Sequence, residues 1–338
     1  MKSLRSTFIK QCKLCNTEGV ILYKALTDIL GTIEGSWDVN KCPNCGLQWL
    51  IPMPISDDIY LAYSEYPTHE YERIKNKSLK ERIKLGYLAN KYGYTKEKVN
   101  LIDKILGLIL LPFPFKRVSL DFWFNVLKGI KGKGRLLDIG CGNGELVEMM
   151  NNWGWQAEGI EVDYKAVDVA RSRGLKVTQG DFLEIDLSLE AFDAIISSHV
   201  FEHVYEPIDF LKKCYKAIKP NGIICIATPN SESLQNSIFK KNWMALDAPR
   251  HLYLYNPSSM ALCAKKANIN YYEIKTTSRG SRFIASASLM IQKTGQYHWN
   301  DKIDFHGFFF SNTIELLEYI ILLYKKNKGV EMLFIARK

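Results

Sequence analysis

The stretch that decides the fold is Leu136-Leu137-Asp138-Ile139-Gly140-Cys141-Gly142-Asn143-Gly144. Two leucines and an acid lead into three glycines at alternate positions, and the helix-compatible run Glu-Leu-Val-Glu-Met-Met follows. This order predicts a strand, a tight turn and a helix. Glycine lacks the Cβ that would obstruct a close turn or an approaching ligand, and such a turn delivers the ligand to a helix N-terminus. The stretch therefore predicts a nucleotide-type binding corner.

The spacing of the glycines separates the candidate cofactors. A dinucleotide fingerprint reads G-x-G-x-x-G, with the pyrophosphate on the helix N-terminus. Here the third glycine comes one residue early, and Asp138 stands two residues before the turn. A carboxylate at that point repels a pyrophosphate but suits a ligand that carries an ammonium group. The alternatives are a purely structural glycine turn and an NAD site with a shifted glycine.

The segment from Asp138 to Gly144 resembles motif I of the class I S-adenosylmethionine-dependent methyltransferases. The resemblance covers roughly residues 132–276 and the last strand, and it includes the order of the later motifs. It implies an α/β fold with a Rossmann-like, doubly wound sheet of seven strands, mostly parallel with the last strand antiparallel. We expect an N-terminal four-cysteine zinc ribbon and a helical connector before this domain.

The composition sets bounds on the rest. With 338 residues the chain exceeds one typical domain, and its 47% hydrophobic and 12% aromatic content is typical of globular proteins. The net charge of +9 permits a nucleotide sugar, RNA or an acidic membrane as partner and identifies none of them, and a solvated basic surface explains it equally well.

The sequence shows no feature that would take the chain through a membrane. Residues 1–8 lack the apolar core of a signal peptide. The apolar run 105–115 is interrupted by a glycine and two prolines, and a span needs about 20 apolar residues. We therefore expect a cytoplasmic protein without a transmembrane segment, with peripheral membrane contact left open.

Two C-x-x-C pairs lie near the N-terminus, namely Cys12 with Cys15 and Cys42 with Cys45. Each pair supplies two thiolates from one tight turn, and four thiolates complete a tetrahedral structural Zn²⁺ site. The alternative is a disulfide or a redox-active pair. We therefore divide the chain into a zinc ribbon (1–50), a helical connector or lid (51–131) and a methyltransferase domain (132–338) with an insert at about 278–328.

Further candidate cofactor residues follow the first turn. Glu161 ends a second predicted strand, where an acid is well placed to accept both ribose hydroxyls, and Asp163 is expected to cap the next helix. By resemblance, Asp181 would accept from the adenine amine and Phe182 would lie on the ring. The expected cofactor-binding residues are Asp138, Gly140, Gly142, Asn143, Gly144, Glu161, Asp181, Phe182 and Ser198.

A fourth predicted strand ends in Ser198-His199-Val-Phe-Glu202-His203. Ligands of parallel α/β sheets bind at the carboxyl ends of the strands, so His203 is a candidate general base; a structural histidine is the alternative. The run resembles the Glu-x-x-Glu-His metal pattern of some quinone-biosynthesis O-methyltransferases, although His199 stands where that pattern has Glu.

A second basic segment, Pro249-Arg250-His251-Leu252, resembles one found in methyltransferases that modify carbohydrates and natural products. Arg250 or His251 would orient an acceptor hydroxyl or anion, and His251 is the second candidate base. A capping or packing role for this loop is equally compatible with the sequence. The candidate catalytic residues are thus His203, His251 and His199.

These patterns predict an S-adenosylmethionine-dependent methyltransferase that methylates a hydroxyl of a sugar or small metabolite by in-line transfer. The alternatives are an rRNA or tRNA methyltransferase that docks RNA through its zinc ribbon, and a sugar C-methyltransferase. A zinc-dependent scaffold with a degenerate methyltransferase fold is the non-enzyme alternative. We expect a small-molecule or carbohydrate acceptor as partner, with RNA second.

Overall fold

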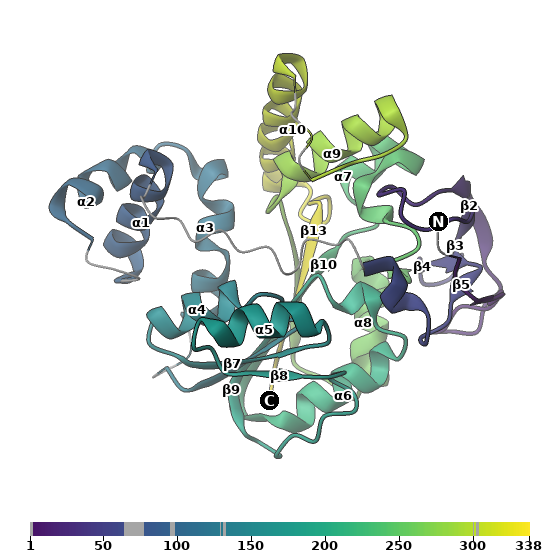
Figure 1. The fold of residues 1–338 in the computed structure, drawn as a ribbon, viewed down its shortest axis with the longest axis horizontal. Helices are drawn as coiled ribbons and strands as arrows, with labels where there is room; N and C mark the ends of the chain where they lie inside the picture. The colour runs from purple at the N-terminus through teal and green to yellow at the C-terminus, as the bar shows by residue number, and fades with distance from the viewer. Residues whose placement is uncertain are drawn as a thin grey trace. The chain divides into compact units, whose positions relative to one another are not determined.

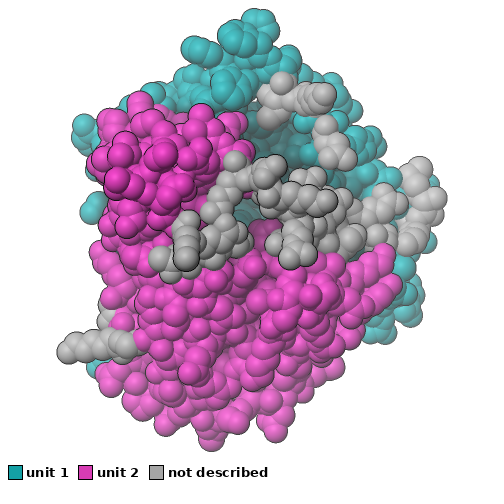
Figure 2. Space-filling model, turned by 60° about the vertical axis from the view of Figure 1, so that its left-hand side comes forward, with its two compact units in different colours: residues 1–67, 199–212, 226–335 teal, residues 68–198, 213–225, 336–338 magenta. Residues whose placement is uncertain are grey.

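The structure is a computed structural model that describes residues 3–63, 78–94, 99–128, 130, 133–299, 301 and 304–338. The chain forms two compact units, drawn in teal and magenta in Figure 2. Unit 1 contains residues 1–67, 199–212 and 226–335, and unit 2 contains residues 68–198, 213–225 and 336–338. This division describes compactness and does not test the three-part division by sequence, which stays a prediction.

The centre of unit 2 is a parallel sheet built around β6 (Arg135–Ile139). It pairs in parallel with β7 (Gln156–Glu161) on one side and with β9 (Phe192–Ser198) on the other, and β8 (Val177–Gln179) pairs in parallel with β7. Strands that are buried on both faces read as continuous apolar runs, and Leu136, Leu137 and Ile139 are all buried. Helices α4 (Glu145–Asn152) and α5 (Tyr164–Ser172) pack against these strands (Figure 1).

The complete sheet has seven strands in the order β12-β13-β10-β9-β6-β7-β8. Its further strands are β10 (Ile218–Pro229), β12 (Tyr272–Thr277) and β13 (Glu331–Arg337). Asn221 N donates to Lys338 O and Asn230 N donates to Val330 O, so β10 and β13 run in opposite directions. The mixed, mostly parallel sheet confirms the predicted fold class.

Residues 219–222 read Lys-Pro-Asn-Gly, but the structure has them in β10. Asn221 has a φ of 65°, but its backbone N–H remains paired with the C-terminal strand region. A Lys-Pro-Asn-Gly sequence is typical of a turn, and here pairing with a distant segment overrides that local preference.

The described part of the connector is largely helical, although residues 51 and 53–54 lie in strands. It contains α1 (Leu79–Tyr92), α2 (Leu101–Gly107), η3 (Leu108–Leu110) and α3 (Pro114–Leu127). Ser78 and Glu81 form a capping box at the start of α1, and Asn100 caps α2, which satisfies otherwise unpaired N–H groups. Earlier in the chain, the expected cap at 56–58 precedes a short 3₁₀ helix, η1 (Ile59–Tyr63). The connector is rich in tyrosine, and two of these residues, Tyr66 and Tyr71, lie outside the described residues.

Unit 1 contains a four-stranded sheet with the order β11-β4-β3-β2. Three strands come from the cysteine-rich N-terminal region, namely β2 (Val20–Leu26), β3 (Trp37–Lys41) and β4 (Gln48–Ile51). The fourth, β11 (Tyr253–Leu254), follows the Pro-Arg-His-Leu segment and pairs antiparallel with β4. A smaller sheet pairs β1 (Ser6–Thr7) with β5 (Met53–Pro54). The N-terminal region therefore shares its sheet with a loop that lies about 200 residues later in the chain.

The remaining helices follow β9 and β10 in the chain. They are η4 (Phe201–His203), α6 (Pro207–Ala217), α7 (Leu234–Phe239), η5 (Lys240–Asn242), η6 (Met244–Leu246), α8 (Pro257–Lys266), α9 (Ser281–Thr294) and α10 (Phe305–Tyr324). Among the residues that the structure describes, one helix, α10, is long and apolar enough to cross a membrane by length and composition. The sequence predicts an apolar helix at about residues 314–324 of the insert, and the helix in the structure begins nine residues earlier, at Phe305.

Candidate functional site

The glycine turn of unit 2 has the geometry that its sequence predicts. Gly140, Gly142 and Gly144 all have positive φ values, of 71°, 52° and 82°, a region that favours glycine. Gly140 N donates to Ile160 O at 2.8 Å, which ties the turn to the end of β7. A Cβ on Gly144 would lie 2.6 Å from Leu175 Cδ1, so no larger residue fits where α4 begins.

Two acids lie buried at this turn, Asp138 on β6 and Glu161 at the end of β7, and they are 2% and 8% exposed. The Glu161 carboxylate accepts from Gly142 N at 2.8 Å, Val162 N at 2.8 Å and Asp163 N at 2.9 Å. Burial raises the pKa of Glu161, and the three backbone N–H groups oppose that shift. Burial and then the charge of Glu161 raise the pKa of Asp138 well above its ordinary value.

The two raised pKa values indicate what this corner can bind. Desolvation and a nearby like charge both disfavour an ionised carboxylate, and a cationic ligand at the corner would reverse that penalty. The arrangement thus fits the ammonium and sulfonium groups of S-adenosylmethionine better than the anionic pyrophosphate of a dinucleotide. The individual ligand roles of Asp138 and Glu161 stay predictions.

The predicted adenine residues have different environments. Asp181 is exposed, and its carboxylate accepts from Leu183 N at 2.7 Å. Phe182 is buried, and Lys213 Nζ lies 5.4 Å from the centre of its ring. Asn143 lies in the turn, where its side chain accepts from Glu145 N, and Ser198 is the last residue of β9. Their contacts with a cofactor stay predictions.

In unit 1, His199 is held by acids. Its Nε2 lies 2.8 Å from Glu331 Oε1, and its Nδ1 lies 3.3 Å from Glu202 Oε1. Partial burial lowers the pKa of His199, but the carboxylates of Glu202 and Glu331 outweigh it and raise the pKa to about 9. The imidazole is therefore already protonated at neutral pH, so His199 is the least suited of the three candidates to accept a proton.

Glu202 is completely buried among these histidines. Its Oε2 accepts from Thr228 Oγ1 at 2.8 Å, whereas Oε1 accepts no hydrogen bond from the described residues. Burial raises the pKa of Glu202, but the neighbouring histidines, His199 foremost, outweigh it and lower the pKa to about 2. Oε1 instead lies in an ion pair with His199, whose protonated Nδ1 is 3.3 Å away.

His203 and His251 lie beside Glu202 with their ring centres 4.7 Å apart. His203 Nδ1 lies 2.9 Å from Arg250 O, and His251 Nδ1 lies 2.7 Å from Ala245 O. Because a carbonyl oxygen only accepts, we assign the Nδ1 proton to each ring in its neutral form. Each Nε2 then carries a lone pair, and His251 Nε2 lies 3.9 Å from Glu202 Oε1.

The two imidazoles differ in their electrostatic surroundings. Burial, followed by the neighbouring His251, lowers the pKa of His203 to about 4, so His203 is neutral at pH 7. His251 Nε2 has two carboxylates within 3.9 Å, those of Glu202 and Asp247. A proton accepted at His251 Nε2 would therefore lie close to two negative charges, whereas a proton on His203 would be buried beside another imidazole.

Of the two roles that the sequence left open for Arg250, the structure favours packing. Its side chain is completely buried, and its guanidinium donates to Asp28 Oδ1 at 2.5 Å, to Asp247 Oδ1 at 2.6 Å and to Ala62 O at 3.3 Å. These partners occupy its planar donor edge. Arg250 instead holds its own loop, including His251, to the N-terminal part of unit 1.

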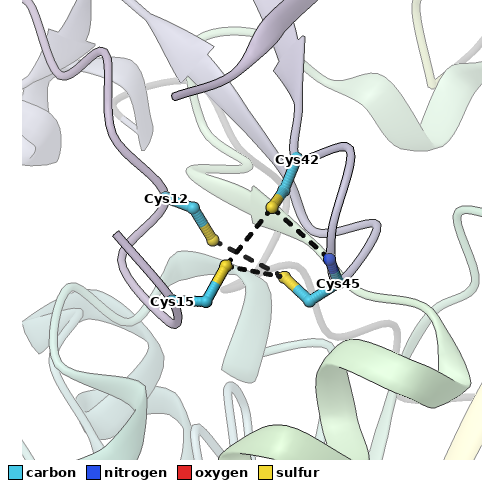
Figure 3. A group of neighbouring side chains, drawn as sticks. All are labelled: Cys12, Cys15, Cys42 and Cys45. Carbon is cyan, nitrogen blue, oxygen red and sulfur yellow. Dashed lines mark hydrogen bonds between the residues drawn. The ribbon is translucent and has the colours of Figure 1, made fainter. Parts of the chain in front are cut away.

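The four predicted metal cysteines form one cluster (Figure 3). Their Sγ atoms are separated by 3.6 Å from Cys12 to Cys45, 3.4 Å from Cys15 to Cys42 and 3.8 Å from Cys15 to Cys45. A tetrahedral site with Zn–S bonds of about 2.3 Å requires sulfur atoms about 3.8 Å apart. The cluster thus has the dimensions of a four-thiolate metal site.

The two cysteine turns have the same backbone geometry, which accounts for the cluster. Asn16 N donates to Cys12 O, and Gly46 N donates to Cys42 O, at 2.9 and 3.0 Å. Asn16 and Gly46 adopt positive φ values of 57° and 76°. A Cβ on Gly46 would lie 2.2 Å from Asn256 Nδ2, so this position also requires glycine for space.

A second group could also hold an ion. Glu202, His203 and His251 each offer a ligand atom, and these atoms lie within 4.8 Å of one another. The predicted trio of His199, Glu202 and His203 is thus replaced by one in which His251 takes the place of His199. His199 is engaged with Glu331, which Arg279 also contacts at 2.5 Å.

Sequence reasoning missed three partners of this histidine cluster. Tyr63 Oη lies 2.7 Å from His203 Nδ1, Thr228 contacts Glu202, and Asp28 contacts Arg250. Asp28 and Arg250 are separated by 222 residues in the chain. No local pattern marks Tyr63 or Asp28. Thr228, by contrast, lies near the carboxyl end of a strand, where parallel α/β sheets bind their ligands.

Comparisons with known proteins find similarity to methyltransferases. Residues 117–274 match a family described as a methyltransferase domain. The ubiquinone biosynthesis O-methyltransferase of Paracidovorax citrulli is 27% identical over 167 residues, which are 45% of this chain and 70% of that protein. The enzyme of the same name from Actinobacillus pleuropneumoniae is 33% identical over 124 residues, 33% of this chain and 53% of that protein. The chain spans about half the length of most of the curated relatives it matches.

Solved structures with a similar fold include a methyltransferase of Archaeoglobus fulgidus that depends on S-adenosylmethionine (TM-score 0.45, 19% identity, covering 70% of this chain and 99% of that one). Another is phosphoethanolamine N-methyltransferase 2 of Haemonchus contortus, with a TM-score of 0.46 and 16% identity over 90% of this chain and 70% of that one.

Proposed function

We propose that this chain, whose residues 117–274 form an S-adenosylmethionine-dependent methyltransferase domain, methylates a hydroxyl group of a small metabolite or sugar. The observation that carries the proposal is the pair His203 and His251, whose Nδ1 atoms are tied to backbone carbonyls beside the buried Glu202. A hydroxyl must lose a proton when it is methylated, and a neutral imidazole with a free Nε2 is suited to accept it.

Strands β6 and β9 lead to the predicted cofactor residues and to the predicted bases, respectively. Ser198 ends β9, which runs parallel to β6, and His199 follows it directly. Parallel strands place their carboxyl ends at one edge, where α/β sheets bind ligands. Strand β9 therefore ends at the same edge of the sheet as β6, which leads into the glycine turn.

The cofactor supplies an electrophilic methyl group on its sulfonium. Asp138 and Glu161 bind its cationic and ribose groups at the glycine turn, and positioning of the acceptor in line contributes about 7 to 11 kcal/mol of the barrier reduction. His251 Nε2 takes the hydroxyl proton, and the carboxylates of Glu202 and Asp247 stabilise the resulting imidazolium. His203 remains neutral and packs against the His251 ring.

The names of the relatives support oxygen as the methylated atom, since those of the curated proteins above are O-methyltransferases. Methylation of a hydroxyl leaves the base as a cation. The buried, ionised Glu202 beside His203 and His251 stabilises such a cation.

We also propose that the four-cysteine cluster binds Zn²⁺. Thiolate ligands in tetrahedral geometry select zinc or iron–sulfur clusters, and the sulfur separations fit a single ion. Elemental analysis of the purified protein tests this: one zinc per chain is expected, and its loss in Cys15→Ser with Cys45→Ser would confirm the ligands. Iron in place of zinc would contradict it.

The test of the base is a comparison of three substitutions in single-turnover methyl transfer. His251→Gln should lower the rate about 10²- to 10⁴-fold, the range for a lost general base, and His203→Gln should lower it less. His298→Gln alters an exposed histidine and serves as the control. Equal activity of His251→Gln and wild type would refute the assignment.

The acceptor class needs a separate measurement. Purified protein is incubated with methyl-labelled S-adenosylmethionine and an extract that contains metabolites, glycans and RNA, with and without nuclease. Label that survives nuclease in the small-molecule or carbohydrate fraction is expected. Label released by nuclease would overturn the proposal in favour of RNA methylation.

A further inference from the structure

Helix α10 (Phe305–Tyr324) packs on unit 1 through a narrow face that contains one large apolar side chain. It begins at Asp304, whose side chain accepts from Gly307 N at 2.7 Å, and its 20 residues give a length of about 30 Å. The buried residues of this helix are Gly307, Ser311, Ile314 and Glu318. They recur at intervals of four, three and four residues and so form one narrow stripe, in which only Ile314 has a large apolar side chain.

Polar contacts hold that stripe in place. Glu318 accepts from Gln235 Nε2 at 2.8 Å and from Ser281 Oγ at 2.8 Å, and it also accepts from Val330 N. These partners come from α7, α9 and the start of the last strand region, all within unit 1. Because a buried carboxylate needs its partners, this network fixes the rotation of α10 about its axis.

The opposite face of α10 is apolar and exposed. Phe305, Phe309 and Leu323 are 75%, 66% and 61% exposed. The further exposed apolar residues of the helix are Phe308, Phe310, Leu316, Leu317, Ile320 and Tyr324. The helix is described over its whole length and contains two charged residues, Glu315 and Glu318, neither of which is exposed. The same face also carries the exposed polar residues His306 and Thr313. Single exposed apolar residues are ordinary, but this many on one helix face mark an interaction site.

The width of the patch favours lipid over a protein helix. At 100° per residue, Phe308 lies at one edge of the exposed apolar arc and Phe310 lies at the other. The arc between them spans about 200° of the helix circumference. A partner helix covers a narrow stripe of a and d positions, whereas lipid surrounds every side that the protein leaves open. Only 22% of the apolar segment is buried in the protein, and its length and composition equal those of a membrane span.

Charge at the end of the helix also favours lipid, and an acidic surface in particular. Lys325 and Lys326 follow Tyr324 directly and are exposed. Lysines at the end of an apolar helix reach the headgroup region of a bilayer, where anionic lipids attract them. Since Glu318 is fixed on the protein side, the helix lies along the membrane surface and does not cross it.

We propose that α10 is a membrane-docking helix that lies flat on an anionic bilayer, with its phenylalanine and leucine side chains in the acyl boundary. The site requires no cofactor or acceptor, so it is independent of the methyl-transfer proposal. It is tested by binding alone.

The experiment is sedimentation of the full-length protein with sucrose-loaded vesicles of phosphatidylcholine, with or without 30% phosphatidylglycerol. Wild type should bind the anionic vesicles, and the double variant Phe309→Glu with Leu323→Glu should lose at least tenfold in partitioning. The matched control is Val20→Glu with Ile21→Glu, which alters exposed apolar residues of β2 in the same unit. Lys325→Gln with Lys326→Gln should weaken binding to anionic vesicles and leave binding to neutral ones unchanged.

Circular dichroism and thermal unfolding of each variant confirm that loss of binding is not loss of folding, since the altered side chains point away from unit 1. Absence of binding by wild type, or binding that is unaffected by Phe309→Glu with Leu323→Glu, would overturn the proposal. Light scattering without lipid tests the other possible partner of α10, which is a second copy of the chain. If wild type is a dimer, does not bind vesicles, and becomes monomeric in this variant, α10 binds a second copy of the chain instead.

Discussion

Glu161 shows at the scale of a single residue how one carboxylate can serve both fold and ligand. Its Oε1 accepts from Val162 N and Asp163 N and its Oε2 accepts from Gly142 N, so one lone pair on Oε2 remains for a ribose hydroxyl. The same residue thus shapes the turn and is available to the cofactor.

We predict that Glu161→Ala raises the dissociation constant of S-adenosylmethionine at least 100-fold. Hydrogen bonds to a charged group contribute about 1.5 to 3 kcal/mol each, and the turn loses its tie to Gly142. Isothermal titration calorimetry measures the effect. Glu158→Ala is the control, because Glu158 lies on the same strand but pairs with Arg135 and Lys176. Unchanged affinity of Glu161→Ala would refute the ribose assignment.

Glu318 leads to a second prediction at this scale, on the pH dependence of stability. Burial raises its pKa to about 7, against the effect of hydrogen bonds from Gln235, Ser281 and Val330. The folded state therefore holds a proton that the unfolded state releases above its ordinary pKa of 4.5. The free energy of unfolding should fall as pH rises from about 5 to 7, by about 3 kcal/mol at 1.36 kcal/mol for each pKa unit.

Glu318→Gln removes this titration, so its free energy of unfolding should lose that part of the pH dependence. Denaturant unfolding between pH 5 and pH 8 measures both slopes. Glu273→Gln, on the exposed strand β12, should follow wild type. Parallel curves for Glu318→Gln and wild type would show that Glu318 does not titrate in this range.

At the scale of elements, the N-terminal sheet supports the loop that carries the proposed base. Strand β11 begins two residues after His251 and pairs with β4 between Tyr253 and Trp49. Leu50 N also donates to Leu252 O at 3.2 Å. We therefore propose that the cysteine cluster, whose four thiolates leave no open ligand site, affects the proposed chemistry only by positioning this loop.

We predict that removal of zinc with a chelator abolishes methyl transfer and leaves the affinity for S-adenosylmethionine within threefold. Structural zinc contributes about 10 to 16 kcal/mol to the folding of small finger peptides, so the strands that hold β11 should loosen, whereas Asp138 and Glu161 belong to unit 2. Activity and cofactor titration on the same sample separate the two effects. Cys45→Ser should be inactive from the start and insensitive to chelator. Full activity of zinc-free protein would contradict the positioning role.

At the scale of the whole molecule, two strands belong to both units. Strand β10 passes from unit 2 to unit 1 after Cys225, and β13 passes from unit 1 to unit 2 after Ile335. A strand cannot unfold in one half and keep its ladder intact in the other, so the continuous sheet should couple the unfolding of both units.

We therefore predict a single calorimetric transition, which S-adenosylmethionine at 100 times its dissociation constant stabilises by about 2.7 kcal/mol. Tryptophan probes occur in both units, with Trp49 and Trp243 in unit 1 and Trp153 and Trp155 in unit 2. Single-tryptophan variants should report the same midpoint. Two separate transitions, with only that of unit 2 shifted by the cofactor, would refute the coupling.

The sequence by itself determined the parts that depend on short-range geometry. The three alternate glycines, the capping residue Asp163 and the paired C-x-x-C turns act within a few residues, and the structure has each of them in the expected conformation. The resemblance of the glycine motif and of the later motifs to class I methyltransferases likewise implied the class of the sheet. Local backbone sterics and hydrogen bonding settle such features wherever the rest of the chain lies.

Only the tertiary structure decided which distant side chains meet. The sequence left open whether Arg250 orients an acceptor or packs, because its partner Asp28 lies 222 residues away, and its burial follows from a sheet that β11 joins through pairing with β4. The polar stripe of α10 likewise turns inward because Gln235, Ser281 and Val330 converge on Glu318. The energy of a buried charge depends on all the partners that surround it, and a single local pattern does not contain them.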